Sequence, residues 1–321
     1  MARGPFGLEC NDMGRHYHWV SMDGDGPGFP LVEIAGKKTG PTLFVTAGLH
    51  GSEYTGIDAL MRFSLILDPE RLEGRVIALP LVNLPAFQQR TATVCPVDGK
   101  NLNRIFPGSP TGSYSERLAY CLAQEIEAQA DYVLDLHGND LGEAVLPLAA
   151  VHLTGEGVDE TTSGMAAAYG LPYQVHSHPG EPWGSGGTLF AWAAQEGIPA
   201  ILVQSGGQGQ FGEEDVARHL WGLINLTRFL GMQREEVERR RAPEVFTDLN
   251  WVKAERDGIY RSWVDAGEKV TRGQILGTFY DYFGRELKKE LSPAPGTVLY
   301  AAMAPSMRSN RVLAAIGTNS Q

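Results

Sequence analysis

TLFVTAGLHGSEYTG, residues 42–56, joins a short apolar run to a glycine-rich turn. Residues 42–47 predict a buried strand, and the helical period after the turn predicts a helix over residues 57–67. A strand that leads through a short loop into a helix is the building unit of α/β proteins. Because sites in such proteins form beyond the carboxyl ends of the strands, His50 and Glu53 fall where a functional site is expected.

The same order of elements recurs along the chain. Further apolar runs predict strands over residues 75–82, 132–136 and 200–203, and amphipathic periods predict helices over residues 115–130 and 213–230. Alternating strands and helices predict an α/β fold with a mixed, largely parallel sheet and helices on both faces.

The C-terminal part of the chain follows a different pattern. After the charged stretch 233–241 and Pro243, glycines interrupt short β-like runs from Phe246 onward, with little helical period. We therefore predict a first domain over residues 1–242 and a small β domain over residues 243–321.

The composition narrows the functional class. The 321 residues carry a formal net charge of -11 and a pI near 5.2, which argues against the basic face that nucleic-acid binding needs. No apolar run approaches the ~20 residues of a membrane span or resembles a signal peptide. Cys10, Cys95 and Cys121 form no CxxC pair and indicate reduced thiols. We expect a cytoplasmic protein that binds neither nucleic acid nor membranes.

Two histidines stand at the ends of predicted strands. His50 lies in GLHGSE after the first strand, and His137 lies in DLHG after a later one. With Glu53 they offer two imidazoles and one carboxylate, and three such ligands plus an open position are typical of catalytic zinc. Taken singly, each residue also has a simpler interpretation: a strand-end histidine can be an ordinary core or loop residue, and a carboxylate in a first turn can favour the helix dipole.

A polar loop lies between the two motifs. Residues 96–108 read PVDGKNLNRIFPG, in which Asn103 and Arg104 are adjacent. A carboxamide and a guanidinium side by side can bind a carboxylate through planar, directional hydrogen bonds. The alternative is a turn in which both side chains satisfy only the loop backbone.

GLHGSEYTG, PVDGKNLNRIFPG and DLHG, in this order and spacing, resemble the succinylglutamate desuccinylase/aspartoacylase family, which is related to the zinc carboxypeptidases. The resemblance covers roughly residues 41–230, and NLNRxFPG is its most specific string. It implies a zinc carboxypeptidase-like fold with one zinc ion per chain, and a glycine-punctuated β unit at the C-terminus is also typical of the family.

The resemblance also implies roles for individual residues. His50, Glu53 and His137 match the zinc ligands, and Asn103 with Arg104 matches the pair that binds the substrate carboxylate. Arg90 resembles the arginine that steadies the oxyanion, although the spacing of this loop varies among relatives.

One position departs from the family pattern. The family's general base is a glutamate at the end of a late strand, where this chain has Gln204 in the string PAILVQSGGQG. Glutamine can hydrogen-bond water or substrate but cannot accept a proton, and losing a general base typically costs about 100- to 10,000-fold in rate. An engineered Glu→Gln change that traps substrate and a natural variant that binds without hydrolysing are both open, and the otherwise complete site favours the first. Glu143 or Glu213 could substitute, but their spacing gives no support.

The expected activity is zinc-dependent hydrolysis of the amide bond of a small N-acyl amino acid or related carboxylate-bearing amide. Zinc would activate a water and polarise the carbonyl while a carboxylate moves the proton to the leaving amine. Two alternatives remain at this point: a carboxypeptidase, which needs an extended groove, and a non-catalytic protein that keeps the metal and carboxylate sites. A small-molecule partner is expected, and the chain could form a homo-oligomer.

Overall fold

The fold is described from a computed structural model that covers residues 4–8, 12–22, 27–178, 181, 183, 187–238 and 240–319. Cys10 lies outside these residues, whereas Cys95 is a buried free thiol. No helix in the described part of the chain is long and apolar enough to cross a membrane.

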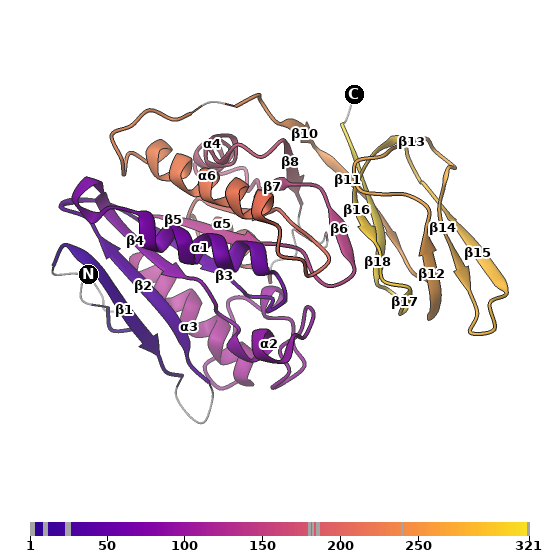
Figure 1. Cartoon of the computed structure of the whole chain (residues 1–321), viewed down its shortest axis with the longest axis horizontal. Helices are drawn as coiled ribbons and strands as arrows, with labels where there is room; N and C mark the ends of the chain where they lie inside the picture. Colours follow the sequence, from indigo (N-terminus) through magenta and orange to yellow (C-terminus); the bar gives the residue numbers. More distant parts are fainter. Residues whose placement is uncertain are drawn as a thin grey trace.

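A large mixed sheet forms the centre of the molecule (Figure 1). Its strand order is β1-β2-β4-β3-β5-β9-β7-β8-β10. The strands β4, β3, β5 and β9 are parallel neighbours. β2 runs antiparallel to β1 and β4, and β7 runs antiparallel to β9 but parallel to β8, which is also parallel to β10. The bounds of these strands are β1 Gly14–Val20, β2 Phe29–Ala35, β3 Lys38–Ala47, β4 Glu73–Leu79, β5 Tyr132–His137, β7 Leu148–His152, β8 Tyr173–Ser177, β9 Ala200–Gln204 and β10 Glu244–Phe246.

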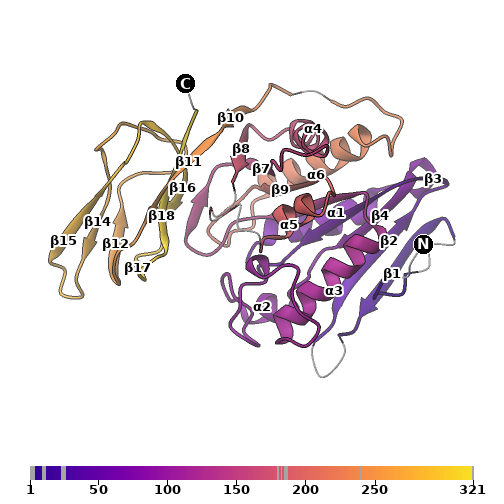
Figure 2. The same ribbon diagram turned by 180° about the vertical axis from the view of Figure 1, so that it is seen from behind.

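Helices cover both faces of this sheet, as Figures 1 and 2 show from opposite sides. The helices are α1 Tyr54–Ile66, α2 Leu84–Gln89, α3 Tyr114–Gln129, α4 Asp159–Tyr169, α5 Leu189–Gln195 and α6 Glu213–Phe229, with short 3-10 turns at η1 Pro69–Arg71 and η2 Leu102–Arg104. One core packs α1, α4 and α6 against the sheet, and another packs α3 and α5 against its other face.

The alternation of side chains along β3 shows how one strand supplies both cores. Leu43 and Val45 belong to the α1 side and Phe44 to the α3 side, and all three are fully buried. Successive side chains of a strand point to opposite faces, so a strand covered on both faces is apolar throughout. The predicted α/β fold with a largely parallel sheet and helices on both faces is confirmed.

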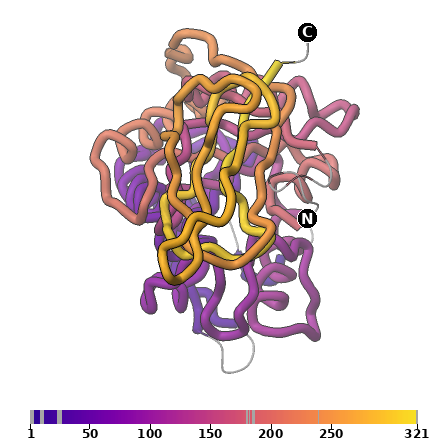
Figure 3. Tube along the Cα trace, turned by 90° about the vertical axis from the view of Figure 1, so that its right-hand side faces the viewer, coloured from indigo at the N-terminus to yellow at the C-terminus, as the bar shows by residue number. Residues whose placement is uncertain are grey.

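A C-terminal β unit lies against one end of the main sheet, and Figure 3 looks onto it. One of its sheets has the order β11-β18-β16-β13, and the other has the order β15-β14-β12-β17. Its strands are β11 Asp248–Lys253, β12 Gly258–Ser262, β13 Lys269–Val270, β14 Ile275–Tyr280, β15 Glu286–Leu291, β16 Gly296–Ala302, β17 Ser306–Met307 and β18 Val312–Thr318.

Two short strands join the β unit to the main part of the chain. β6, Glu143–Val145, pairs with β16 of the β unit, and β10 pairs with β8 of the large sheet. β10 ends at Phe246, and the first strand of the β unit, β11, begins at Asp248. The division into domains at residues 242/243 stays a prediction.

Helix α1 begins at Tyr54, three residues earlier than the period of the sequence predicts. Thr55 and Gly56 are part of the helix: the Thr55 hydroxyl donates to the carbonyl of Ser205, and a Cβ at Gly56 would lie 3.3 Å from the backbone of Leu136. A residue without a side chain therefore lets the first turn of α1 approach β5 closely. This contact sets the position of the chain just after Glu53.

We expect Gly56→Val to lower the free energy of unfolding by about 1 to 3 kcal/mol, because the added atoms overpack the contact with Leu136. Urea unfolding of the purified protein measures the change. Gly157→Val is the matched control, since an added Cβ there meets no atom within 4 Å, and its effect should stay within about 0.5 kcal/mol. Equal effects of the two substitutions would contradict the account of α1.

Candidate functional site

The candidate site lies at the carboxyl ends of three parallel neighbours, β3, β5 and β9. His50 follows the end of β3 at Ala47, His137 is the last residue of β5, and the register places His137 beside Gln204 at the end of β9. Strand ends that meet at one edge of a sheet bring residues distant in the sequence together.

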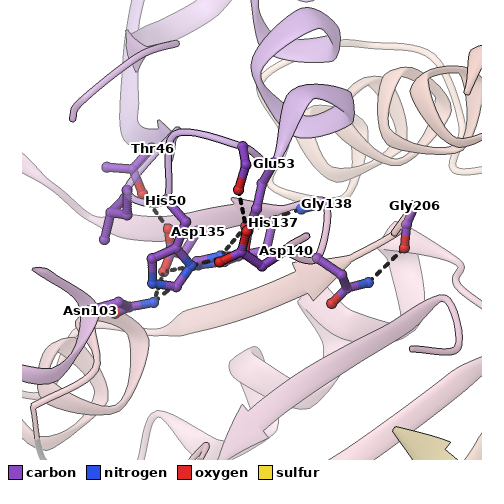
Figure 4. Close-up of polar contacts among 12 residues, drawn as sticks. Thr46, His50, Glu53, Asn103, Asp135, His137, Gly138, Asp140 and Gly206 are labelled. Atoms are coloured by element: carbon purple, nitrogen blue, oxygen red, sulfur yellow. Dashed lines mark hydrogen bonds and ion pairs between the residues drawn. The ribbon is translucent and has the colours of Figure 1, made fainter. Parts of the chain in front are cut away.

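The carboxylate of Glu53 stands between the two imidazoles (Figure 4). Its Oε1 lies 2.9 Å from Nδ1 of His50, and its Oε2 lies 2.6 Å from Nδ1 of His137. The backbone N–H of Gly138 also donates to Oε2, at 3.2 Å. Glu53 is the residue that caps α1, but its side chain makes no capping hydrogen bond. The carboxylate therefore binds the histidines instead of serving the helix end.

Other side chains hold the far nitrogen of each imidazole. Nε2 of His50 lies 3.0 Å from Oδ1 of Asn101, and Nε2 of His137 lies 2.9 Å from Oδ2 of Asp135. Asp135 is fully buried, and the Thr46 hydroxyl donates to its Oδ1 at 2.8 Å. The partner oxygens of Asn101 and Asp135 can only accept, so each Nε2 donates to them when it carries the proton. Each Nδ1 faces Glu53 at the centre of the cluster.

The charges within this buried cluster reinforce one another. Burial opposes the charged form of His137, but Asp135 and Glu53 outweigh it and raise the pKa of His137 to about 10. Burial would also raise the pKa of Glu53, but the charges of His137 and His50 hold that pKa well below its usual range. The carboxylates around the cluster therefore favour positive charge on its imidazoles.

These residues fit a divalent cation. One ligand atom from each of His50, Glu53 and His137 lies within 4.8 Å of the others, and all three residues are buried. Two imidazole nitrogens and a carboxylate oxygen form a donor set that suits zinc. The outward hydrogen bonds to Asn101 and Asp135 are the kind of second contact that orients metal-binding imidazoles.

Asn103 and Arg104 also reach the site, but their side chains have different surroundings. Oδ1 of Asn103 accepts from the backbone N–H of Leu189 at 2.8 Å, and Nδ2 donates to Asp135 at 3.1 Å. Asn103 is buried, and protein groups engage both ends of its carboxamide. Arg104 is exposed at the cavity that the cluster lines. The assignment of this pair to a substrate carboxylate stays a prediction, in which Arg104 carries the charge.

Of the two other predicted site residues, Gln204 lines the cavity and Arg90 does not. Gln204 lines the same cavity, and its buried Oε1 has no hydrogen-bond partner in the described part of the chain. Arg90 ends α2 with a left-handed backbone, is exposed, and is not among the described residues that line the cavity. Its role at an oxyanion stays a prediction.

The cavity measures about 540 Å³ and is walled by both parts of the molecule. The main part contributes the cluster, Arg104 and Glu143 among others, and the C-terminal β unit contributes Trp251, Lys253, Tyr300 and Arg311. Sequence reasoning missed these four residues. It also missed Asp135, although a polar residue two positions before His137 on a strand shares its face and is a usable signal.

Comparison with known proteins matches the region that contains these motifs. Residues 39–230 match the model of the succinylglutamate desuccinylase/aspartoacylase catalytic domain. The chain is 32% identical over 256 residues to N-alpha-acetyl-L-2,4-diaminobutyric acid deacetylase from Halomonas elongata, a match that spans 78% of this chain and 73% of the relative.

Solved structures share the whole fold. A succinylglutamate desuccinylase/aspartoacylase from Rhodobacter sphaeroides is 26% identical with a TM-score of 0.85, and the match covers 100% of each chain. The product-bound ectoine utilization protein EutE (DoeB) from Ruegeria pomeroyi is 24% identical with a TM-score of 0.86, and the match covers 97% of this chain and 98% of that one. The latter likeness supports the fold alone.

We expect metal analysis of the purified protein to find a divalent cation that depends on the cluster. His50→Ala should reduce the metal content below about a tenth of an equivalent per chain, because the two remaining ligand residues bind the ion weakly. Asp135→Asn should weaken metal affinity about 10- to 100-fold, since His137 loses its charged partner. His16→Ala, which changes a partly exposed histidine on β1, is the control. A content that His50→Ala leaves unchanged would exclude the cluster as the site.

Proposed function

The chain belongs to the succinylglutamate desuccinylase/aspartoacylase family, and from this premise we propose that it hydrolyses the amide bond of a small N-acyl amino acid, with one zinc ion as cofactor. His50, Glu53 and His137 hold the metal in this proposal. The family match and the deacetylase relative support an amide deacylase acting on small acyl amino acids.

The observation that carries the proposal is the carboxylate of Glu53 set between two imidazoles that face a cavity. When bound there, zinc supplies a Lewis acid for the acyl carbonyl and lowers the pKa of a water. The protein's own contribution is to orient the imidazoles through Asn101 and Asp135 and to keep the ligand atoms away from bulk solvent.

The cavity suits a small substrate that carries a carboxylate. Its volume of about 540 Å³ lies within the range typical of small-molecule sites. Arg104, Lys253 and Arg311 bring positive charge to its wall although the whole chain is acidic. The relative from Halomonas elongata is named for an N-acetylated amino acid, which is the substrate class proposed here.

The alternative of a carboxypeptidase finds less support. A carboxypeptidase needs a groove that admits an extended chain on the acyl side of the scissile bond. In this structure Trp251 and Tyr300 of the β unit wall the cavity, and Trp251 packs edge-on against Trp183, with ring centroids 5.1 Å apart. These contacts favour a short substrate.

The alternative of a binding protein without turnover rests on Gln204. Gln204 lines the cavity, and in this proposal its position is that of the family's general base, where a carboxamide cannot accept a proton. A protein that keeps the metal ligands and Arg104 but lacks any base would bind carboxylate-bearing amides and leave them intact.

We expect the protein as it stands to release free amine from at least one member of a panel of N-acetyl and N-succinyl amino acids. Amine release measured by a colorimetric assay provides the rate, and His50→Ala should reduce it at least about 100-fold because the metal is lost. Binding without amine release across the whole panel would favour the non-catalytic alternative.

KM and kcat distinguish the roles proposed for Arg104 and Arg90. Arg104→Gln should raise KM for N-acyl amino acids about 10- to 100-fold, and should change KM little for the same substrates with an amidated carboxyl group, because the lost ion pair is absent there. Arg90→Ala should lower kcat if Arg90 moves in to steady the oxyanion. An unchanged kcat in Arg90→Ala would remove Arg90 from the site.

A further inference from the structure

Hydrolysis needs a group that accepts a proton from the attacking water, and Gln204 cannot do so. Three carboxylates line the cavity in the part of the chain that the structure describes: Glu53, Glu143 and Glu181. If the chain turns over substrate without a base supplied from outside, one of these carboxylates is the expected proton acceptor.

Two of these carboxylates are committed to other partners. Glu53 binds both imidazoles of the cluster and the N–H of Gly138. Glu181 accepts from the backbone N–H of His178 at 3.0 Å, in the loop that follows β8. Glu143 is bound neither to the cluster nor to that loop, and its one side-chain hydrogen bond comes from Tyr300, which also lines the cavity.

Glu143 is held in the cavity wall by groups from both parts of the molecule. It begins β6, and the Tyr300 hydroxyl donates to its Oε1 at 3.2 Å. Tyr300 pairs with Val145 across the β6·β16 ladder, so Glu143, Val145 and Tyr300 share one face of the pair and all three line the cavity. No hydrogen bond from a described residue reaches Oε2 of Glu143.

The backbone brings Glu143 next to the segment that follows Gln204. The N–H of Gln208 donates to the carbonyl of Glu143 at 3.2 Å, and the Asn139 side chain donates to the carbonyl of Gly206 at 2.7 Å. The turn after β5 and the turn after β9 are thus tied together. Glu143 and Gln204 belong to adjoining segments of one wall.

We propose that Glu143 is the general base of this chain and acts in place of the residue at position 204, an inference that rests on the proposed amide hydrolysis. As the oxygen of the attacking water bonds to the acyl carbon, Oε2 of Glu143 takes one proton from that water. When the C–N bond breaks, the proton passes from Glu143 to the departing nitrogen. One water is consumed, an acid and an amine leave, and no oxidant or reductant is needed.

The surroundings of Glu143 suit this task. Burial raises the pKa of its carboxyl, and the negative charges of Asp140 and Glu53 act in the same direction. A base whose pKa lies closer to neutrality accepts and returns a proton more readily. The charged and titratable groups that face Glu143 are Asp140, Glu53, His50, Tyr300 and Arg104.

A double substitution cycle tests the proposal on the full-length, metal-loaded protein. Glu143→Gln should lower kcat about 100-fold or more, with KM within about threefold, because the base is lost and binding is kept. Gln204→Glu should raise kcat less than about tenfold, since a base is already present. In the Gln204→Glu background, Glu143→Gln should change kcat by less than about threefold, because the restored glutamate takes over.

Glu181→Gln is the matched control, since it neutralises another carboxylate of the same cavity and should leave kcat within about threefold. Equal losses from Glu143→Gln in both backgrounds would show a binding or structural role and overturn the proposal. Inactivity of the parent chain together with a gain of 100-fold or more in Gln204→Glu would also overturn it. The latter result leaves the proposed substrate class intact, whereas inactivity of both forms would refute the proposed function itself.

Two measurements other than turnover accompany the cycle. Metal content and thermal unfolding of Glu143→Gln should match those of the parent, and if that variant fails to fold, Glu143→Asp replaces it with an expected partial loss of kcat. Calorimetric affinity for the product amino acid should stay within about threefold in Glu143→Gln. A large loss of product affinity would assign Glu143 to an amino group of the ligand and contradict the base role.

The pH profile of kcat/KM tests whether Glu143 is the group that sets its acidic limb. Tyr300→Phe removes the hydrogen bond that lowers the pKa of Glu143, so the acidic limb of kcat/KM should move to higher pH. A limb that does not move in Tyr300→Phe and persists in Glu143→Gln would show that another group sets it, against the proposal.

Discussion

The site depends on the register between two parallel strands. Thr46 of β3 lies opposite Asp135 of β5, and this pairing brings His137 to the same edge of the sheet as the loop that carries His50 and Glu53. A shift of β5 by one residue would turn Asp135 and His137 to the other face of the sheet. The buried hydrogen bond from Thr46 to Asp135 marks the register, since a slip would leave a buried carboxylate without its donor.

The sequence predicted the parts of the fold that have a strong local signal. Apolar strands such as 42–47 and amphipathic helices such as 213–230 were located within a few residues, because the double-sided core dictates their patterns. The start of α1 was missed because it depends on the approach of Gly56 to Leu136. Strands β6 and β10 have three residues each and depend on their pairing with β16 and β8. The local sequence of such short strands does not predict this pairing.

Within the candidate site, too, only the residues with a local motif could be predicted from the sequence. His50, Glu53 and His137 carry their own motifs, and the structure brings them into one cluster. Glu143 and Tyr300 are 157 residues apart and meet through the β6·β16 pairing, so their sequence neighbourhood gave no reason to join them. The same pairing lets the small β unit limit the cavity, which connects the architecture of the C-terminus with the size of the substrate.

The central claim is that two imidazoles and one carboxylate hold a single zinc ion with room for a further ligand. X-ray absorption at the zinc edge of the purified protein measures the ligands directly. The account predicts one zinc per chain with two imidazole nitrogens and oxygen ligands at about 2.0 to 2.2 Å. A spectrum dominated by sulfur at about 2.3 Å, or one without the imidazole signature, would contradict it.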